Sequence, residues 1–158
     1  MDSEHGLDDV SWQILRELQD NARLSYSELG RRVGLTPPAV AERVRRLEEA
    51  GIIRGYRTEV DLERIGLPLI AFIRIATAEH SVVQFGTIAK DLPEVLECHR
   101  VTGDDSYITK VAVSSVRHLE TLLNRLHPYG KTVTSIVLSS PVTHRVIGTP
   151  EASEGRGA

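Results

Sequence analysis

The spacing of apolar positions divides the chain into two parts. From Leu7 to Leu18 the apolar residues recur every three or four positions, which is typical of one helix face. Beyond Leu69, short β-rich runs alternate with helical patterns. The predicted divisions are a first domain over residues 7–60, a linker over 61–68, a second domain over 69–147 and a disordered tail over 148–158.

The first part is expected to form three helices. The first covers residues 7–18, and Asp8 and Asp9 are placed to cap its positive end. Ser25 followed by Glu28 is a capping box, which predicts that the second helix runs from about residue 26 to residue 33.

Only three residues separate the second helix from the third. Gly34 can end a helix in the left-handed conformation, Thr36 is a good N-cap, and Pro37 suits the first helical position. The third helix then continues to Ala50. Such a short connection makes the two helices cross steeply, which is the geometry of a helix-turn-helix.

The third helix separates apolar from polar side chains. At about 100° per residue, Val40, Val44 and Leu47 point toward the other two helices. The opposite side carries small residues and then arginines, which suits insertion into a DNA major groove about 12 Å wide. The residues expected to contact DNA here are Thr36, Pro38, Ala39, Glu42, Arg43, Arg45 and Arg46.

A wing is expected after this helix. Residues 52–57 read as a short strand and turn, and residues 58–60 as a second strand. Arg54 and Arg57 are then available to DNA phosphates. The first domain is therefore predicted to be a winged helix-turn-helix.

The remaining hundred or so residues show one pattern twice. A strand, a helix and a strand precede the turn at residues 103–106, and the same order follows it. Two such units in tandem make a ferredoxin-like βαββαβ fold, so the fold class is α+β. The expected elements are strands over 69–76, 95–101, 107–113 and 133–138, helices over 81–92 and 115–126, and a further strand over 141–147.

One face of this sheet is expected to lack a cover. The two helices occupy one face, yet Ile70 and Phe72 alternate with Ala71 and Ile73, so both faces carry apolar residues. Apolar faces of that size are rare on a monomer. A homodimer is therefore predicted, which would also bring two helix-turn-helices to the half-sites of a palindromic operator in double-stranded DNA.

Charge and composition leave DNA binding open. Net charge is −3, and residues 1–64 hold 10 arginines against 13 acidic residues. Seven of the arginines nevertheless fall between Arg31 and Arg57, which forms a basic stripe on an acidic domain. A three-helix protein-docking module with a solvated arginine face is the alternative, but solvated faces usually mix Lys with Glu, and every base here is Arg.

Composition also bears on location and metal binding. No apolar run approaches the roughly 18 residues of a membrane span, and the first residues are acidic, so a cytoplasmic protein without membrane contact is expected. Cys98 is the only cysteine and lacks the spacing of a zinc site, so it reads as a buried small hydrophobe. No metal or cofactor is predicted.

The chain from Leu7 to about Leu138 resembles the Lrp/AsnC, or feast/famine, family of leucine-responsive and asparagine regulators. The first domain carries the resemblance in Leu7-Asp8, Ile14-Leu15, Asn21-Ala22-Arg23, Glu28-Leu29, Val33-Gly34-Leu35, Arg43-Val44, Leu47-Glu48, Gly51-Ile52-Ile53 and Gly55-Tyr56. The rest lies in Ile65-Gly66-Leu67-Pro68, Pro93 to Cys98, Val101-Thr102-Gly103-Asp104 and Thr134 to Leu138. The motifs keep the order and spacing of the family.

The resemblance implies a regulator with an ACT-like second domain, called RAM, that dimerises and assembles further into tetramers or octamers. It also implies an amino-acid effector bound where dimers meet. Asp104 would accept hydrogen bonds from its ammonium group, with Thr134 and Ser135 among the donors to its carboxylate. The residues implied at this site are Gly103, Asp104, Asp105, Ser106, Tyr107, Thr134, Ser135 and Ile136.

Two positions depart from the family pattern. Ser106 stands where a second acidic residue is common, and Ser11 stands where the first helix commonly has Asp. A simpler interpretation of Asp104 and Asp105 is a polar turn between strands, and Thr134 and Ser135 also suit a strand without any ligand.

Two other functions compete with sequence-specific regulation. An architectural protein that wraps DNA with little sequence choice would share the fold and the arginines. A small group of tetrapyrrole decarboxylases resembles the same architecture, and His99, Arg100 and His144 are the candidate residues for such chemistry. The arginine-bearing third helix favours DNA binding, and no catalytic residue is predicted.

Overall fold

The computed structural model describes residues 7–78 and 81–149, which divide into two compact units. The first unit holds the described residues up to Glu59 together with residues 142–149, and the second runs from Val60 to Pro141. Most of the tail predicted over 148–158 lies outside the described residues. Among the helices described, none is long and apolar enough to cross a membrane.

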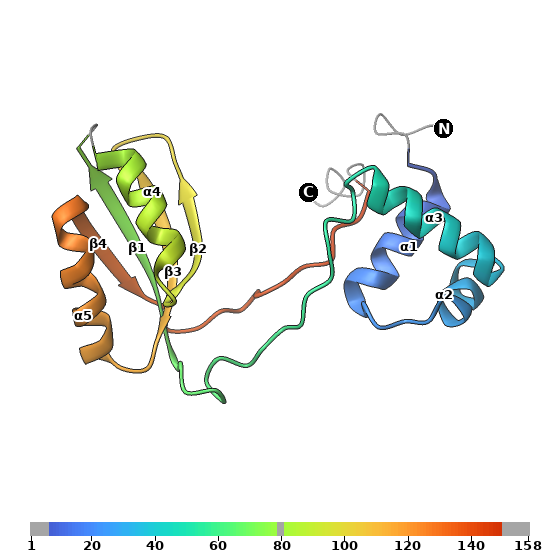
Figure 1. Ribbon diagram of the computed structural model, residues 1–158. Helices are drawn as coiled ribbons and strands as arrows, with labels where there is room; N and C mark the ends of the chain where they lie inside the picture. The colour runs from blue at the N-terminus through green and yellow to red at the C-terminus, as the bar shows by residue number, and fades with distance from the viewer. Residues whose placement is uncertain (1–6, 79–80, 150–158) are drawn as a thin grey trace, which may run out of the picture. The chain divides into compact units, whose positions relative to one another are not determined.

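Three helices form the body of the first unit: α1 (Asp9–Asp20), α2 (Tyr26–Val33) and α3 (Pro37–Glu49) (Figure 1). Two predicted caps are present: the Asp8 side chain accepts from the Ser11 N–H at 2.8 Å, and the Ser25 hydroxyl accepts from the Glu28 N–H at 3.2 Å. Each satisfies a backbone donor that the first turn leaves free. The three helices bury a common core that includes Ile14, Leu29, Val40, Val44 and Leu47.

The turn between α2 and α3 is as short as predicted. Gly34 adopts φ 72°, and the Leu35 N–H donates to the Gly30 carbonyl at 2.9 Å. A β-carbon on Gly30 would overlap the carbonyl oxygen of Leu35. The close approach of the two backbones therefore requires glycine at position 30, which the apolar pattern does not reveal.

The two strands predicted for the wing are absent. Residues 52–60 form no strand, so that prediction is wrong. The N–H groups of Ile52 and Ile53 both donate to the Leu47 carbonyl, at 2.9 and 3.0 Å. The start of the segment thus completes the end of α3 and does not enter a strand ladder.

The further strand predicted at 141–147 does not form either. This segment contains no strand, and Ile147 contacts α1 of the first unit. The Gln19 side chain accepts from the Ile147 N–H at 2.9 Å and donates to its carbonyl at 3.0 Å. One amide thereby satisfies both backbone groups of Ile147, and no sheet edge is needed.

The second unit is ferredoxin-like, as predicted. Its four strands are antiparallel in the order β2-β3-β1-β4, and α4 and α5 cover one face of the sheet (Figure 1). The elements are β1 (Leu69–Thr77), α4 (Val82–Asp91), β2 (Val95–Arg100), β3 (Tyr107–Val113), α5 (Val116–Leu126), a 3₁₀ turn (His127–Tyr129) and β4 (Gly130–Ile136).

The register of β1 separates the two faces of the sheet. Ala71, Ile73 and Ile75 are fully buried in the core beneath the helices. The alternate positions Phe72 and Arg74 are exposed on the other face. The described residues of this unit leave that face uncovered.

Candidate nucleic-acid interface and ligand site

The polar side of α3 carries the residues predicted to contact DNA. Pro38, Arg45 and Arg46 are exposed, while Val40 and Val44 on the other side are fully buried. The N-cap residue Thr36 is exposed as well, and its side chain makes no capping hydrogen bond. The structure therefore brings small residues and arginines onto one accessible face of the unit.

Glu42 organises the arginines of this face. Its carboxylate contacts Arg45 and Arg46, each at 2.8 Å, and these hydrogen bonds lower the pKa of Glu42 to about 2. Arg45 also pairs with Glu49 on the same helix. Part of the charge of both arginines is thus balanced by acids of α3 itself.

Arg43 has a different environment from its neighbours. Its guanidinium lies 2.6 Å from the Asp8 carboxylate and 3.1 Å from the Ser11 hydroxyl, so it joins α3 to the start of α1. Hydrogen bonds from Ser11, and then from Arg43, lower the pKa of Asp8 to about 2. Although Arg43 is a predicted DNA contact, its side chain is engaged within the unit.

Arg32 likewise belongs to the internal structure. It contacts Glu17 of α1 at 2.7 Å and Glu28 of its own helix at 3.1 Å, and these bonds raise its pKa. Arg54 and Arg57 are exposed and have no ion pair among the described residues. The basic stripe therefore contains both engaged and available arginines.

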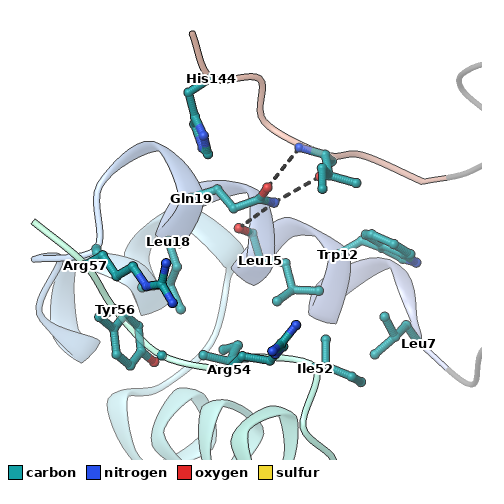
Figure 2. Close-up of a pocket in the computed structure, with 14 residues that line it drawn as sticks. Leu7, Trp12, Leu15, Leu18, Gln19, Ile52, Arg54, Tyr56, Arg57 and His144 are labelled. Carbon is teal, nitrogen blue, oxygen red and sulfur yellow. Dashed lines mark hydrogen bonds between the residues drawn. The ribbon is translucent and has the colours of Figure 1, made fainter. Parts of the chain in front are cut away.

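A groove of about 500 Å³ lies beside Arg54 and Arg57, and the sequence did not predict it. Figure 2 shows both arginines reaching toward Leu15 and Leu18 of α1, with His144 on the opposite rim. The groove is lined by Leu7, Trp12, Leu15, Leu18, Gln19, Ala22, Ile52, Ile53, Arg54, Gly55, Tyr56, Arg57, His144 and Ile147. Its wall includes residues 144 and 147, whose position beside α1 follows from no local sequence signal.

The loop before β3 holds half of the predicted ligand residues. Gly103 and Asp104 are exposed at its tip, and Asp105 lies 3.5 Å from Arg74 of β1. The Ser106 hydroxyl accepts from the Thr77 N–H at 3.1 Å. This bond ties the loop to the end of β1.

Tyr107 faces the core. Its ring is buried against Phe85, with centroids 4.9 Å apart, and its hydroxyl donates to the Val82 carbonyl at 3.0 Å. Gly86 leaves room for that hydroxyl, because a β-carbon there would come within 2.8 Å of it. The Tyr107 side chain therefore supports α4.

Residues 134–136 do not meet this loop within one chain. Thr134 pairs with Ile73 and Ile136 with Ala71, whereas the Ser106 N–H bonds to Ile75 farther along β1. At about 3.3 Å per residue, Thr134 lies about 7 Å and Ile136 about 13 Å along the strand from that point, and β4 lies on the opposite side of β1 from β3. Ser135, opposite Phe72, points to the uncovered face.

Comparison with known proteins identifies both units. Residues 70–147 match the family model described as the Lrp/AsnC ligand binding domain. Residues 7–54 match the model described as winged helix-turn-helix DNA-binding. The first of these matches reaches all four strands of the second unit and continues into residues 142–147, and the second match lies within the first unit.

Whole-chain relatives agree with these matches. The HTH-type transcriptional regulator LrpC of Bacillus subtilis is 37% identical over 84% of this chain and 92% of its own. The leucine-responsive regulatory protein of Escherichia coli is 41% identical over 84% of this chain and 85% of its own.

Solved structures of relatives have the same fold. The structure of Bacillus subtilis LrpC has a TM-score of 0.84 at 36% identity, and covers 87% of this chain and 99% of its own. A Neisseria meningitidis regulator, described as a complex with L-Met, has a TM-score of 0.86 at 30% identity, and it covers 92% of this chain and 99% of its own. Two matched domains in order and relatives of this similarity show that the chain belongs to the Lrp/AsnC family of transcriptional regulators.

Proposed function

We propose that this regulator reads a palindromic operator with α3 and that an amino acid controls its DNA binding or assembly. The observation that carries the proposal is the exposed face of α3, where Pro38 and Ala39 precede Arg45 and Arg46. Small residues let the helix approach the floor of a major groove, and arginines are the commonest partners of guanine edges. Such a protein works where the DNA is, in the cytoplasm, and needs no catalytic residue.

The effector proposal draws on chemistry and on relatives. One relative is named leucine-responsive, and another was solved as a complex with L-Met. In this chain the exposed Asp104 carboxylate is an acceptor for an ammonium group, and the Ser135 hydroxyl is a donor for a carboxylate. Because the two groups do not meet within one chain, the proposed site takes one of them from each of two copies.

Dimerisation through the uncovered sheet face is part of the same proposal. Ile70, Phe72 and Val133 lie on that face, and both Phe72 and Val133 are 40% exposed. A second copy would remove this apolar surface from water, which is the main source of association free energy. Further assembly into tetramers or octamers is also proposed, from the family resemblance.

The DNA-binding proposal is tested with Arg46→Ala. We expect operator affinity to fall about tenfold or more, since one arginine contact to a base is worth about 1–3 kcal/mol. Fluorescence anisotropy with the operator and with random duplex, over a series of salt concentrations, measures it. Arg117→Ala, an exposed arginine of the second unit, is the control. Equal affinity for operator and random duplex would favour the architectural alternative.

The effector proposal is tested by a thermal-shift screen of the twenty amino acids. A ligand of the folded state raises the melting temperature, and we expect Asp104→Ala to abolish that rise without lowering DNA affinity. Equal loss of the ligand response and of DNA affinity would contradict the assignment of Asp104. Absence of a shift with every amino acid would count against an amino-acid effector.

A further inference from the structure

The groove of the first unit has the walls of a small-molecule site. Its volume of about 500 Å³ falls in the range of about 300–1,000 Å³ that ligand pockets occupy. Leu15, Leu18 and Ile53 supply apolar surface from α1 and from the segment after α3. Ile147 closes another side and is held there by the two hydrogen bonds to Gln19 (Figure 2).

The permanently charged side chains of the groove are both positive. Arg54, Arg57 and His144 line it, and no Asp or Glu does. The two guanidinium groups have no ion pair among the described residues, in contrast to the arginines of α3. The groove therefore offers positive charge without a built-in counter-ion.

One further donor in the groove lacks a partner. The indole Nε1 of Trp12 is buried and makes no hydrogen bond within the described part of the chain. Buried polar groups are normally hydrogen-bonded, and a buried N–H without an acceptor is unfavourable. The Gln19 amide is already engaged with Leu15 and Ile147. Arg54 and Arg57 therefore supply the exposed charged donors of the groove.

We propose that this groove binds an apolar monocarboxylic acid, such as a medium-chain fatty acid. Its hydrocarbon part would lie against Leu15, Leu18 and Ile53, and its carboxylate would bind Arg54 and Arg57. An amino acid fits less well, because its ammonium group would find no carboxylate among the lining residues. The site is thus chemically distinct from the one proposed at Asp104, and it lies in the other unit.

Occupancy of the groove would compete with DNA. Arg54 and Arg57 are also the residues predicted to contact phosphates, and a bound carboxylate would cancel part of their positive charge and occupy their hydrogen-bond donors. This consequence rests on the proposed function, whereas binding of the acid does not.

Binding can be read directly from Trp12, the only tryptophan of the chain. The full-length protein is titrated with octanoate below its micellar concentration while tryptophan emission is recorded, in the absence of DNA. We expect a saturable change with octanoate and none with octylammonium or 1-octanol at equal concentration. No saturable change with octanoate, or an equal response to 1-octanol, would overturn the proposal.

Two variants locate the carboxylate. The double variant Arg54→Gln with Arg57→Gln should raise the Kd for octanoate at least tenfold, because it removes both positive charges that bind the carboxylate. Both side chains are exposed, so their replacement leaves the core intact. Arg117→Gln, the same change at an exposed arginine of the second unit, should leave that Kd unchanged. An unchanged Kd in the double variant would contradict the site.

Dilution experiments separate this ligand from a second copy of the chain. If another subunit filled the groove, Trp12 emission would change on dilution and would not respond to octanoate, which would overturn the proposal. If the protein binds octanoate but has equal affinity for operator and random duplex, the proposed groove site stands and the proposed function is contradicted. The groove proposal and the proposed function can therefore be contradicted independently of each other.

Discussion

Arginine side chains of the first unit fall into three environments. Arg32 and Arg43 join helices to one another, Arg45 and Arg46 pair with acids of their own helix, and Arg54 stands without an ion pair in the described chain. The sequence predicts the arginine stripe because the residues cluster along the chain. It does not predict the long-range partners Asp8 and Glu17, which the packing of α1 brings into reach.

At the residue scale, Arg43→Ala should lower stability more than DNA affinity. It removes the contact between α3 and Asp8, the N-cap of α1, and we expect the free energy of unfolding to fall by about 1 kcal/mol because both side chains are partly exposed. Urea denaturation measures the change. The control Arg57→Ala removes no ion pair of the described chain and should leave stability unchanged.

The stability contributed by the contact between Asp8 and Arg43 should depend on pH. The folded-state pKa of Asp8 is about 2, below its ordinary 3.8, so its stabilising effect is present above about pH 4 and is lost as pH falls toward 2. The stability difference between wild type and Arg43→Ala should therefore shrink over that interval. Urea denaturation at a series of pH values tests it, and a constant difference down to pH 2 would contradict the assignment.

Glu42→Gln should strengthen non-specific DNA binding. The change leaves Arg45 and Arg46 without their shared carboxylate, so more positive charge faces the phosphates. We expect higher affinity for random duplex and a steeper dependence on salt, measured by anisotropy. Glu49→Gln affects Arg45 alone and should give a smaller gain. Weaker binding in Glu42→Gln would show that Glu42 itself contacts DNA.

At the scale of elements, several predicted bounds agree closely with the structure. The bounds of α2 and β3 agree with the expected ones, and α1 is displaced by two residues because Asp8 caps it. The failures at residues 52–60 and 141–147 have a different cause. A β-rich run forms a strand only if a partner strand is available, and here Ile52 and Ile53 bond to Leu47 and Ile147 bonds to Gln19 instead.

Gly30→Ala should destabilise the helix-turn-helix. The added methyl group would overlap the Leu35 carbonyl oxygen, which forces α2 and α3 apart. We expect a loss of more than 1 kcal/mol in the free energy of unfolding, although alanine is the better helix former. Ser27→Ala, an exposed change in the same helix, is the matched control for circular-dichroism melting. Greater stability in Gly30→Ala would disprove the close approach.

At the scale of the whole molecule, the open sheet face is predicted to hold two copies together. Phe72→Lys places a charge in the middle of this face and should shift the protein toward monomer in sedimentation velocity. Val83→Lys on α4 is the control, because Val83 is 77% exposed on the helical side of the sheet. An unchanged dimer in Phe72→Lys would place the interface elsewhere.

Sequence reasoning predicted the ligand site less completely than the fold. The loop around Asp104 and the strand around Thr134 were both identified from the family pattern. Their separation within one chain follows from strand order, which places β3 and β4 on opposite sides of β1. The order of residues along the chain does not predict this separation, because the separation depends on which strands pair in the sheet.

The two hydrogen bonds between Gln19 and Ile147 join residues 128 positions apart. During synthesis, the helices of the first unit emerge early, but Ile147, which completes it, leaves the ribosome only after the whole second unit. Domains usually fold in the order in which they are made. Here the first unit begins to fold first and is finished last, after the sheet between its two parts has been synthesised. A nascent chain halted after Pro141 would therefore present a helix-turn-helix whose groove lacks the wall formed by His144 and Ile147.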